Sequence, residues 1–366
     1  MTTPSTNDTI NVGLIGFGLA GRAFHAPVIS AVPGLRLAAI LQRTGSDAAQ
    51  AYPNARIVRT LDELLALPEI RLIVIATPNE THYPLAHQCL AAGRDVLVDK
   101  PFTTTMAEAL DLIQFAKKCG RLLTVYQSRR YDGDFQGILQ LAAAGTLGRI
   151  VRFETHYDRF RPNLKPNAWR ERQAPGAGIL FDIGPHLIDH AFQLFGLPMA
   201  MAADVRNERG GPADDAFDLL LHYPGNVRAA LGSSILAATP RTRFVALGDK
   251  AAFTKNSFDP QEIRLRFGNI PKEGPWGAEP EENWGVLTQI NADGTPVHRR
   301  IPPAATDYRD YYANLRDALQ GRAEPAVTHR QMLDVMQALD LARQSNNQRR
   351  TLPWPNPTGS PLWPRS

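Results

Sequence analysis

Lys100, Asp182 and His186 are the side chains of this sequence whose types and places best suit proton-transfer chemistry. Lys100 follows the apolar run 95–98, which places an ammonium at the carboxyl end of a predicted strand. A histidine titrates near neutral pH and can take up or release a proton there. Asp182 lies four residues before His186, and residues at that spacing share one face of a helix. Together these groups could accept the hydroxyl proton of a secondary alcohol and stabilise the alkoxide while a hydride leaves the carbon.

Each of these residues also has a purely structural interpretation. Pro185 has no amide hydrogen and fits best in a first helical turn, so the helix of about 184–195 is predicted to begin near 182–184. Asp182 could then be only the N-cap of that helix, and His186 a packed or capping histidine. Lys100 could be a solvated lysine at a strand end. The residue types alone leave both interpretations open.

The elements that must position these residues begin with a glycine-rich turn near the N-terminus. An apolar run, 10–15, ends in Gly16-Phe17-Gly18, and Gly21 follows in a helix-like stretch, 19–31. In a dinucleotide-binding loop the first glycine allows the turn, the second lets the backbone approach a pyrophosphate, and the third lets the helix pack on its strand. We therefore predict that Gly16, Phe17, Gly18 and Gly21 bind a cofactor. The alternative is a glycine-rich turn in another α/β protein.

The end of the second predicted strand, 35–41, indicates which nucleotide is bound. A site that prefers NAD places Asp or Glu there to bind the ribose hydroxyls. This sequence has Gln42-Arg43-Thr44 instead, so no carboxylate repels a 2′-phosphate and the Arg43 guanidinium can pair with one. NADP is therefore predicted over NAD, with Arg43 and Thr44 in the site, although Arg43 could also be a solvated loop arginine.

Strands and helices alternate up to about residue 127. Strands are predicted at 10–16, 35–41, 71–76, 95–98 and 121–126, and helices at 19–31, 61–67, 80–92 and 104–119. Such alternation predicts right-handed crossovers and a doubly wound parallel sheet. Ligands of these sheets lie beyond the carboxyl ends of the strands. That rule selects Thr77-Pro78-Asn79 and Asp99-Lys100-Pro101.

Beyond residue 127 long extended segments dominate. A helix is predicted at 134–144 and a strand at 149–158, and further extended segments at 199–206, 216–223, 226–236, 241–248, 251–254, 262–267 and 285–290. Their period-two alternation predicts a mostly antiparallel sheet. Residues 268–284 read as a loop, 307–320 and 328–345 as helices, and 352–366 as an extended strap. We predict an α/β protein with a Rossmann domain at 8–127 and an α+β domain for substrate binding and oligomerisation at 128–366.

Composition excludes several classes of protein. With 366 residues, 21% of them charged and 43% hydrophobic, the chain suits a globular protein of two domains. No apolar run is as long as a membrane span, and residues 1–8 lack the pattern of a signal peptide. Cys89 and Cys119 have no metal-ligand spacing and are predicted to be reduced thiols. The net charge of +4 comes without long basic runs. We expect a cytoplasmic protein with no metal, nucleic-acid or membrane partner.

Several of these segments together resemble the Gfo/Idh/MocA oxidoreductases, the glucose–fructose oxidoreductase and inositol dehydrogenase family, over nearly the whole chain. The matching segments are Gly16–Gly21, Ala76–Asn79 with His82, Asp99–Pro101, Gly176–His186, Tyr308–Tyr312 and Pro325–Val327. Within the family the sequence is most similar to NADP-dependent scyllo-inositol dehydrogenases at Phe24–Pro27, Tyr126–Asp132 and Arg159–Pro162. Asp99 departs from the family, which usually has Glu before Lys-Pro; the charge stays but the reach is shorter.

The resemblance implies a role for each candidate. By it His186 is the general base in oxidation, Asp182 its orienting and charge-stabilising partner, and Lys100 the donor to the alkoxide. It also implies that the cofactor is lined by Thr77, Pro78, Asn79, His82, Asp99, Lys100, Gln127, Trp169 and Arg170. A polyol, scyllo-inositol first, would contact Asp182, His186, Arg130, Tyr157, Arg159 and Arg161. Arginines are as often structural ion-pair partners, Thr77-Pro78 could merely end a strand, and Trp169 could be buried against another subunit.

Two other functions stay open on the sequence. One is an oxidoreductase of the same fold with another substrate, such as an aldose, a dihydrodiol, a biliverdin-like compound or an imine. The other is a non-catalytic NADP-binding regulatory protein, which would not need Lys100, Asp182 and His186. An open antiparallel sheet needs its second face covered, so a homodimer or homotetramer through the second domain is predicted. His25, His87 and His190 have no metal-like partners and are predicted to be structural.

Overall fold

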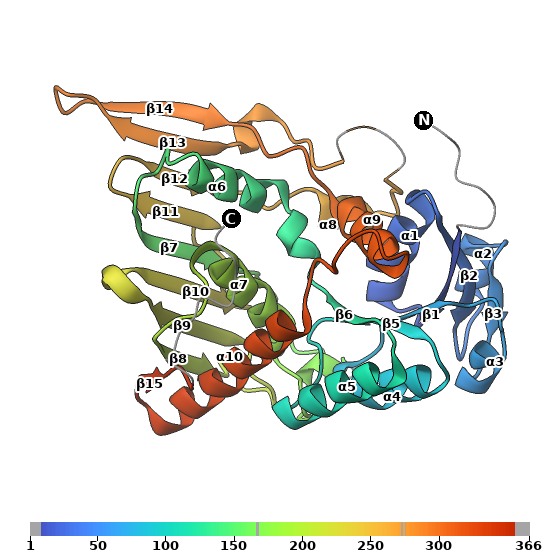
Figure 1. Ribbon diagram of the computed structural model, residues 1–366. Helices are drawn as coiled ribbons and strands as arrows, with labels where there is room; N and C mark the ends of the chain where they lie inside the picture. Colours follow the sequence, from blue (N-terminus) through green and yellow to red (C-terminus); the bar gives the residue numbers. More distant parts are fainter. Residues whose placement is uncertain (1–8, 166–167, 272–273, 275, 356–366) are drawn as a thin grey trace. The chain divides into compact units, whose positions relative to one another are not determined.

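The computed structural model describes residues 9–165, 168–271, 274 and 276–355 (Figure 1). The chain divides into two compact units. Unit 1 comprises 1–128, 260–276 and 307–333, and unit 2 comprises 129–259, 277–306 and 334–366. Two segments from within the predicted second domain, 260–276 and 307–333, therefore group with the N-terminal half of the chain.

Unit 1 is built on a sheet of six parallel strands in the order β3-β2-β1-β4-β5-β6. The strands are β1 (Ile10–Ile15), β2 (Leu35–Leu41), β3 (Arg56–Val58), β4 (Leu72–Ile75), β5 (Asp95–Asp99) and β6 (Leu123–Tyr126). Every residue of β4 and β6 is buried, as expected for strands covered on both faces. The order is that of doubly wound dinucleotide-binding folds. The predicted parallel sheet is confirmed.

Helices cover both faces of this sheet. Helices α4 (His82–Ala91) and α5 (Met106–Cys119) lie on one side, and α1 (Ala26–Ala31) and α9 (Tyr308–Leu319) on the other (Figure 1). Helix α5 begins with a capping box between Thr105 and Glu108 and ends at Gly120, whose φ of 61° is left-handed. The shorter helices of unit 1 are η2 (Ala20–His25), α2 (Asp47–Ala51), α3 (Leu61–Leu65), η3 (Asn79–Thr81) and α8 (Gln261–Arg266).

Unit 2 is built on a sheet in the order β14-β13-β12-β11-β7-β10-β9-β8-β15. Strands β7 and β10 pair in parallel and the other neighbours are antiparallel, which confirms the predicted, mostly antiparallel sheet. The strands are β7 (Ile150–His156), β8 (Ala200–Arg206), β9 (Ala216–His222), β10 (Arg228–Ser234), β11 (Phe244–Gly248), β12 (Ala252–Lys255), β13 (Gly285–Ile290), β14 (Pro296–Ile301) and β15 (Leu352–Pro353).

One face of this sheet carries the helices. They are α6 (Gly133–Ala143), α7 (Ile179–Phe195) and the part of α10 (His329–Gln348) that belongs to unit 2 (Figure 1). Alternate residues of β9 are buried under them, while Asp218 and Leu220 point to the other face, which we call the outward face. Side chains of α10 also bind the free backbone amides at the edge of β8: Ser345 Oγ accepts the Ala203 amide at 3.0 Å, and Asn346 Oδ1 accepts the Val205 amide at 2.9 Å.

The short helices of this half are η4 (Ser128–Tyr131), η5 (Trp169–Glu171), η6 (Pro224–Asn226) and η7 (Glu281–Asn283).

Several short segments differ from the predicted elements. Residues 262–267 were predicted to be extended, but 261–266 form helix α8, in which Glu262 pairs with Arg266 at 2.7 Å across one helical turn. Helix α2 and strands β3 and β14 were not predicted: α2 has five residues, β3 has three, and β14 contains two arginines and is mostly exposed. Of the predicted strap 352–366, residues 352–353 form β15, and 356–366 lie outside the described residues.

Cys89 in α4 and Cys119 at the end of α5 are free thiols. Among the helices of the described ranges, none combines the length and apolar character needed to cross a membrane.

Candidate functional site

The glycine-rich turn after β1 is packed so tightly that two of its glycines cannot be replaced. Gly16 has a φ of 95°, and a Cβ atom there would lie 2.6 Å from the carbonyl oxygen of Ala76. A Cβ atom on Gly21 would lie 2.0 Å from the carbonyl oxygen of Gly16, so the helix could not approach the loop. At Gly18 no atom lies within 4 Å of that position. The open side at Gly18 fits the close approach of a pyrophosphate.

The predicted helix 19–31 follows this turn in two pieces. Residues Ala20–His25 form a π-helical segment, η2, which continues into α1. Phe17 is 8% exposed and its ring meets that of Tyr52 edge-on at 6.0 Å. Its side chain therefore anchors the loop while its backbone stays in the turn.

The loop after β2 holds two exposed candidates, Arg43 and Thr44, on a buried support. The Gln42 side chain accepts the Ala48 amide at 3.1 Å and donates to Asp47. That hydrogen bond is the main reason why the pKa of Asp47 lies below its usual range. A carboxylate therefore does stand five residues beyond Gln42, held by the Gln42 amide.

Arg59 is a residue of this loop that sequence analysis missed. Its Nη1 donates to the carbonyl oxygens of Gln42 at 2.7 Å and Gly45 at 2.9 Å. Arg59 directly follows β3, the strand that was not predicted, so no pattern marked it. It brings a second guanidinium to the loop that carries Arg43.

The loops after β4 and β5 are joined by His82. Its Nδ1 lies 2.8 Å from the carbonyl oxygen of Pro101 and its Nε2 lies 3.0 Å from that of Thr77. The side chain is completely buried, and burial is the main reason why the pKa of His82 is lowered. The buried His82 ring thus connects the backbone of the loop after β4, at Thr77, with that of the loop after β5, at Pro101. Asn79, in the first of these loops, is also buried.

Asp99 ends β5 and is engaged at both carboxylate oxygens. Oδ1 accepts the backbone amide of Lys100 at 2.8 Å, and Oδ2 lies 3.9 Å from Nε2 of His25. The second distance is that of an ion pair and is too long for a hydrogen bond. Gln127 follows β6 at the same edge of the sheet; its Oε1 is buried and has no hydrogen-bond partner among the described residues. The carboxyl edge of this sheet thus offers a glycine turn, a guanidinium loop and a buried free acceptor, a set that fits a nicotinamide dinucleotide.

In unit 2 the helix with Asp182 and His186 begins earlier than predicted. Helix α7 starts at Ile179 and its N-cap is Gly178, so Pro185 lies inside the helix and Asp182 is not a cap. The expected start near 182–184 and the N-cap interpretation of Asp182 are therefore wrong. The residue before Pro185 is Gly184, which has no Cβ to clash with the proline ring, and this lets the helix continue. Asp182 and His186, the latter buried, share one face of α7.

Asp214 holds the start of α7 and was also missed by sequence analysis. Its Oδ1 accepts the Leu180 amide at 2.7 Å, and its carbonyl oxygen accepts the Ile179 amide at 2.9 Å. A Cβ atom on Gly178 would lie 2.1 Å from Asp214 Oδ2, so only glycine fits there. Burial raises the pKa of Asp214 to about 6. Nothing in the sequence distinguishes Asp214 from a surface aspartate.

A pocket opens beside the first turn of α7. It contains about 490 Å³ of empty space, part of it open solvent, and is lined by Arg159, Arg161, Leu164, Arg170, Glu171, Gly178, Ile179, Asp182, Arg209, Gly211, Ala213, Asp214 and Ile235. Two guanidiniums face Asp182: Arg170 Nε lies 3.4 Å from Oδ1, and Arg159 Nη1 lies 3.9 Å from Oδ2. Arg209, which was not predicted, pairs with Asp215 at 2.9 Å. The structure thus brings four predicted residues, Arg159, Arg161, Arg170 and Asp182, to one pocket.

Tyr157 and Arg130 are buried and make contacts within unit 2. Tyr157 is buried, with the guanidinium carbons of Arg129 and Arg159 at 4.6 and 4.7 Å from its ring centre. Arg130 is buried and donates twice to Asp189 of α7, at 2.7 and 2.6 Å. These contacts favour the ion-pair interpretation of Arg130. Trp169 carries the Arg170 guanidinium on its ring at 4.4 Å, and its predicted reach to the cofactor stays a prediction.

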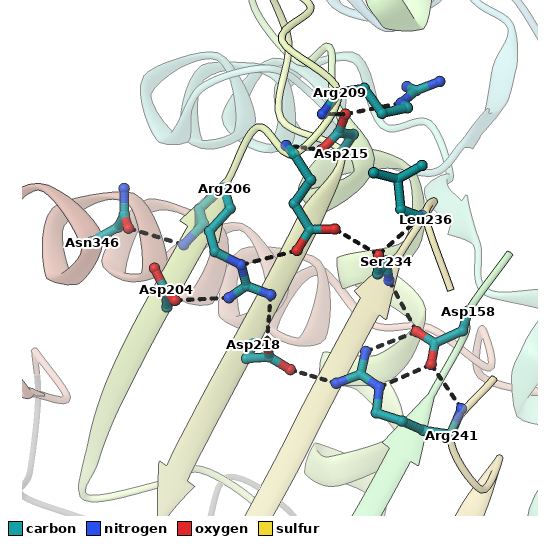
Figure 2. A network of polar contacts seen from close by, with 12 residues as sticks. Asp158, Asp204, Arg206, Arg209, Asp215, Asp218, Ser234, Leu236, Arg241 and Asn346 are labelled. Carbon is teal, nitrogen blue, oxygen red and sulfur yellow. Dashed lines mark hydrogen bonds and ion pairs between the residues drawn. The ribbon is translucent and has the colours of Figure 1, made fainter. Parts of the chain in front are cut away.

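A network on the outward face fixes the segment between Tyr157 and Arg159 (Figure 2). The buried Asp158 carboxylate accepts two hydrogen bonds from the Arg241 guanidinium, at 2.9 and 2.8 Å, and one from the Ser234 amide at 2.9 Å. Burial would raise the pKa of Asp158, but these hydrogen bonds hold it below its usual range. Arg241 also donates to Asp218 at 2.6 Å, and Asp218 accepts from Arg206 at 2.8 Å. Arg159 therefore extends from a fixed backbone.

Comparison with protein families gives two matches along the chain. Residues 10–127 match the model described as "Oxidoreductase family, NAD-binding Rossmann fold", and residues 135–254 match the "GFO/IDH/MocA C-terminal domain". The first match contains the glycine turn and Lys100. The second contains Asp182 and His186.

Curated relatives match over nearly their whole length. The chain is 41% identical over 347 residues to the uncharacterized oxidoreductase YdgJ of Escherichia coli, covering 94% of this chain and 99% of that protein. It is 34% identical over 347 residues to the scyllo-inositol 2-dehydrogenase (NADP(+)) IolW of Bacillus subtilis, covering 94% and 96%.

Solved structures agree with these matches. The oxidoreductase yvaA of Bacillus subtilis superposes with a TM-score of 0.90 at 32% identity, covering 94% of this chain and 98% of that one. The oxidoreductase YPO2259 of Yersinia pestis superposes with a TM-score of 0.88 at 39% identity, covering 94% and 97%. With matches in both halves and a relative 41% identical along almost its entire length, the chain belongs to the Gfo/Idh/MocA family of oxidoreductases.

Proposed function

We propose that this protein is an NADP-dependent dehydrogenase that transfers a hydride between a cyclic polyol, scyllo-inositol first, and NADP. One observation carries the proposal: Asp182, one helical turn before the buried His186, lines an arginine-rich pocket in a chain of an oxidoreductase family. Hydroxyl groups of a polyol suit the guanidinium and carboxylate groups of that pocket. The relative named as a scyllo-inositol 2-dehydrogenase supports this choice of substrate.

NADP, when bound, supplies the hydride acceptor. The chain's own residues handle the proton. In this proposal His186 accepts the proton of the reacting hydroxyl, and Asp182 orients the imidazole and stabilises its charge. The Lys100 ammonium stabilises the developing alkoxide.

NADP rather than NAD is proposed because of the loop after β2. Arg43 and Thr44 are exposed there, and the carboxylate of the loop, Asp47, accepts a hydrogen bond from Gln42. Gly16, Phe17, Gly18 and Gly21 would hold the pyrophosphate, and Gln127, which follows β6, is proposed as a further cofactor contact. The remaining proposed cofactor contacts are Thr77, Pro78, Asn79, His82, Asp99, Lys100, Trp169 and Arg170.

We also propose a homodimer or homotetramer that forms through the outward face of the unit 2 sheet, in the cytoplasm. Ala202, Leu220, Ala230, Glu154 and Val245 form a cross-strand row on that face, apolar except for Glu154, and Leu220 is 37% exposed. Acidic and basic groups stand side by side along the same face, as Asp218 does between Arg206 and Arg241 (Figure 2). A surface that carries both positive and negative charges, together with a mostly apolar row, can complement a second copy of itself.

A substrate panel tests the proposal. Purified protein is assayed with NADP and NAD against inositols, the matching inososes, aldoses, simple alcohols, a dihydrodiol, an imine and a linear tetrapyrrole. We expect turnover of scyllo-inositol and its inosose with NADP(H), and poor turnover of simple alcohols that lack the further hydroxyls. Turnover of only the dihydrodiol, imine or tetrapyrrole would contradict the substrate. Tight NADP(H) binding without any turnover would favour a regulatory protein instead.

A further inference from the structure

Three side chains of unit 1 meet next to Lys100, and two of them, His25 and Tyr312, have no part in the mechanism proposed above. His25 ends η2, Asp99 ends β5 and Tyr312 lies in α9. His25 Nδ1 lies 2.7 Å from the Tyr312 hydroxyl, and His25 Nε2 lies 3.9 Å from Asp99 Oδ2. His25 and Tyr312 are completely buried, whereas the Asp99 side chain is 16% exposed. The sequence predicted only a structural role for His25.

The charge of Asp99 selects one tautomer of His25. A neutral imidazole has one N–H donor and one acceptor nitrogen. If Nδ1 carried the proton, the lone pair of Nε2 would face the carboxylate and repel it. If Nε2 carries the proton, its N–H points to Asp99 and Nδ1 accepts the Tyr312 hydroxyl. Burial, with a smaller effect of nearby Tyr126, Tyr311 and Asp99, raises the pKa of Tyr312 well above its usual value, so the hydroxyl keeps the proton that it donates.

Asp99 connects this arrangement to Lys100. Its second oxygen, Oδ1, accepts the Lys100 amide at 2.8 Å, so the carboxylate has the Lys100 backbone on one side and His25 on the other. Burial would raise the pKa of Asp99, but His25, Lys100 and His82 outweigh burial and lower it, so the carboxylate stays ionised. The His25 ring is itself confined, because the Tyr126 ring lies against it with 4.5 Å between centroids.

We propose that His25 and Tyr312 are positioning residues for Lys100. The charge of Asp99 selects the Nε2–H tautomer of His25, and Tyr312 donates to Nδ1 of that tautomer. The Nε2–H group of His25 attracts the Asp99 carboxylate and so keeps it, and with it the Lys100 backbone, in one orientation. The inference rests on the proposed function, in which Lys100 stabilises the alkoxide. Neither His25 nor Tyr312 touches substrate in this proposal, since both are completely buried.

The tautomer is measurable without cofactor or substrate. In nitrogen-15 NMR of the full chain with labelled histidine, the His25 signals are assigned as those lost in His25→Asn. We expect the pattern of a neutral ring protonated at Nε2. A ring protonated at Nδ1 would overturn the proposal. This readout is independent of whether the protein turns over a polyol.

Two substitutions of His25 separate positioning from packing. The amide of His25→Gln reaches the place of Nε2 and can donate to Asp99, whereas that of His25→Asn reaches only the place of Nδ1 and can accept from Tyr312. We expect His25→Gln to retain most of the wild-type kcat and His25→Asn to lose about tenfold, because the asparagine amide no longer places a donor towards the Asp99 carboxylate. The KM for NADP should change little in either. Equal kcat in the two variants, or a higher kcat in His25→Asn, would overturn the proposal.

A double-mutant cycle covers the case in which a His25 variant folds poorly. Asp99→Asn keeps an acceptor for the Lys100 amide and removes the charge. If His25 acts through Asp99, His25→Asn adds little further loss of kcat in the Asp99→Asn background, whereas independent sites give multiplied losses and would overturn the proposal. Tyr312→Phe should also lower kcat, because Nδ1 of His25 then loses the hydroxyl group that orients the ring; an unchanged kcat would contradict the role of Tyr312. A wild-type chain inactive on every polyol would instead contradict the proposed function, while the NMR result would still stand.

Discussion

At the residue scale, the preference for NADP depends on one exposed guanidinium. Arg43 follows β2, and no ion pair occupies its side chain within the described part of the chain. Arg59 supports the same loop through two backbone carbonyl groups, so the loop keeps its shape when the Arg43 side chain is removed. The effect of Arg43 on a 2′-phosphate can therefore be measured separately from the fold.

Arg43→Ala should weaken NADP(H) binding about ten- to a hundredfold and leave NAD(H) binding nearly unchanged, because a charge-assisted contact contributes about 1.5–3 kcal/mol. Titration with both nucleotides measures this. Arg36→Ala is the matched control, since Arg36 lies near the start of the same strand. If wild-type protein binds NAD(H) as tightly as NADP(H), and Arg43→Ala changes neither, the predicted preference is wrong.

His186→Ala should lower turnover by at least about a hundredfold, the usual scale for a positioned acid or base. Lys100→Ala should do the same, and Asp182→Asn should lower kcat because Asp182 lies inside α7 and is not its cap. NADP(H) affinity should survive His186→Ala, since this residue belongs to unit 2. Steady-state kinetics measures the loss of turnover, and a parallel binding titration measures the NADP(H) affinity. Near-normal turnover of His186→Ala would show that this histidine has only a structural role.

Residue types in the sequence identified the candidate catalytic residues, but not the residues that hold the surrounding backbone in place. A histidine four residues after an aspartate stands out in any sequence, as Asp182 and His186 do. Asp214 and Arg59 do not stand out, because their roles come from contacts with backbone groups far away in the chain. The contact of His25 with Tyr312 likewise joins η2 to α9. No periodicity or spacing predicts such contacts.

At the element scale, helix α7 positions the proposed base, and its first turn depends on Asp214. The carboxylate of Asp214 is half-buried beside the helix N-terminus and accepts the Leu180 amide. Burial raises its pKa to about 6, against about 4 in an unfolded chain. Between these values the folded protein keeps a proton that the unfolded chain releases. The contribution of Asp214 to the free energy of unfolding therefore falls as pH rises from about 4 to 6 and stays low above that.

Asp214→Asn should remove this pH dependence, because the amide keeps an acceptor for Leu180 and carries no charge. Relative to wild type, the Tm of the variant should be higher at pH 7 than at pH 4. Thermal unfolding at the two pH values measures the change, with Asp62→Asn on the surface of α3 as the control. The same Tm difference at both pH values would show that burial of the Asp214 charge does not destabilise the fold.

Long elements were predicted better than short ones. The strands of the parallel sheet other than β3, and helices α5, α9 and α10, repeat their apolar pattern over enough residues to be recognised. Helix α8 spans six residues, in which the alternation of Ile263 and Leu265 with arginines fits a strand as well as a helix. The start of α7 was misplaced because Pro185 was expected in a first turn, and the permissive Gly184 before it was overlooked.

At the scale of the whole molecule, the outward face of the unit 2 sheet is the proposed contact between copies. Arg206 and Arg241 already pair with Asp218. Leu220→Arg adds a third positive charge beside Asp218 and interrupts the row of apolar side chains, so it should shift the protein towards monomer. Sedimentation velocity of wild type and variant measures this. Leu110→Arg, on an exposed position of α5, is the control. A wild-type protein that sediments as a monomer would contradict the proposed assembly.

The most direct test of the central claim is the fate of the hydrogen on the reacting carbon. Wild-type protein is incubated with NADP and scyllo-inositol deuterated at its ring carbons, and the reduced cofactor is examined by mass spectrometry. The proposed hydride transfer predicts one deuterium in each reduced cofactor and a slower rate than with unlabelled substrate if the hydride step limits turnover. Reduced cofactor without deuterium, or none formed under conditions where NADP is bound, would contradict the account.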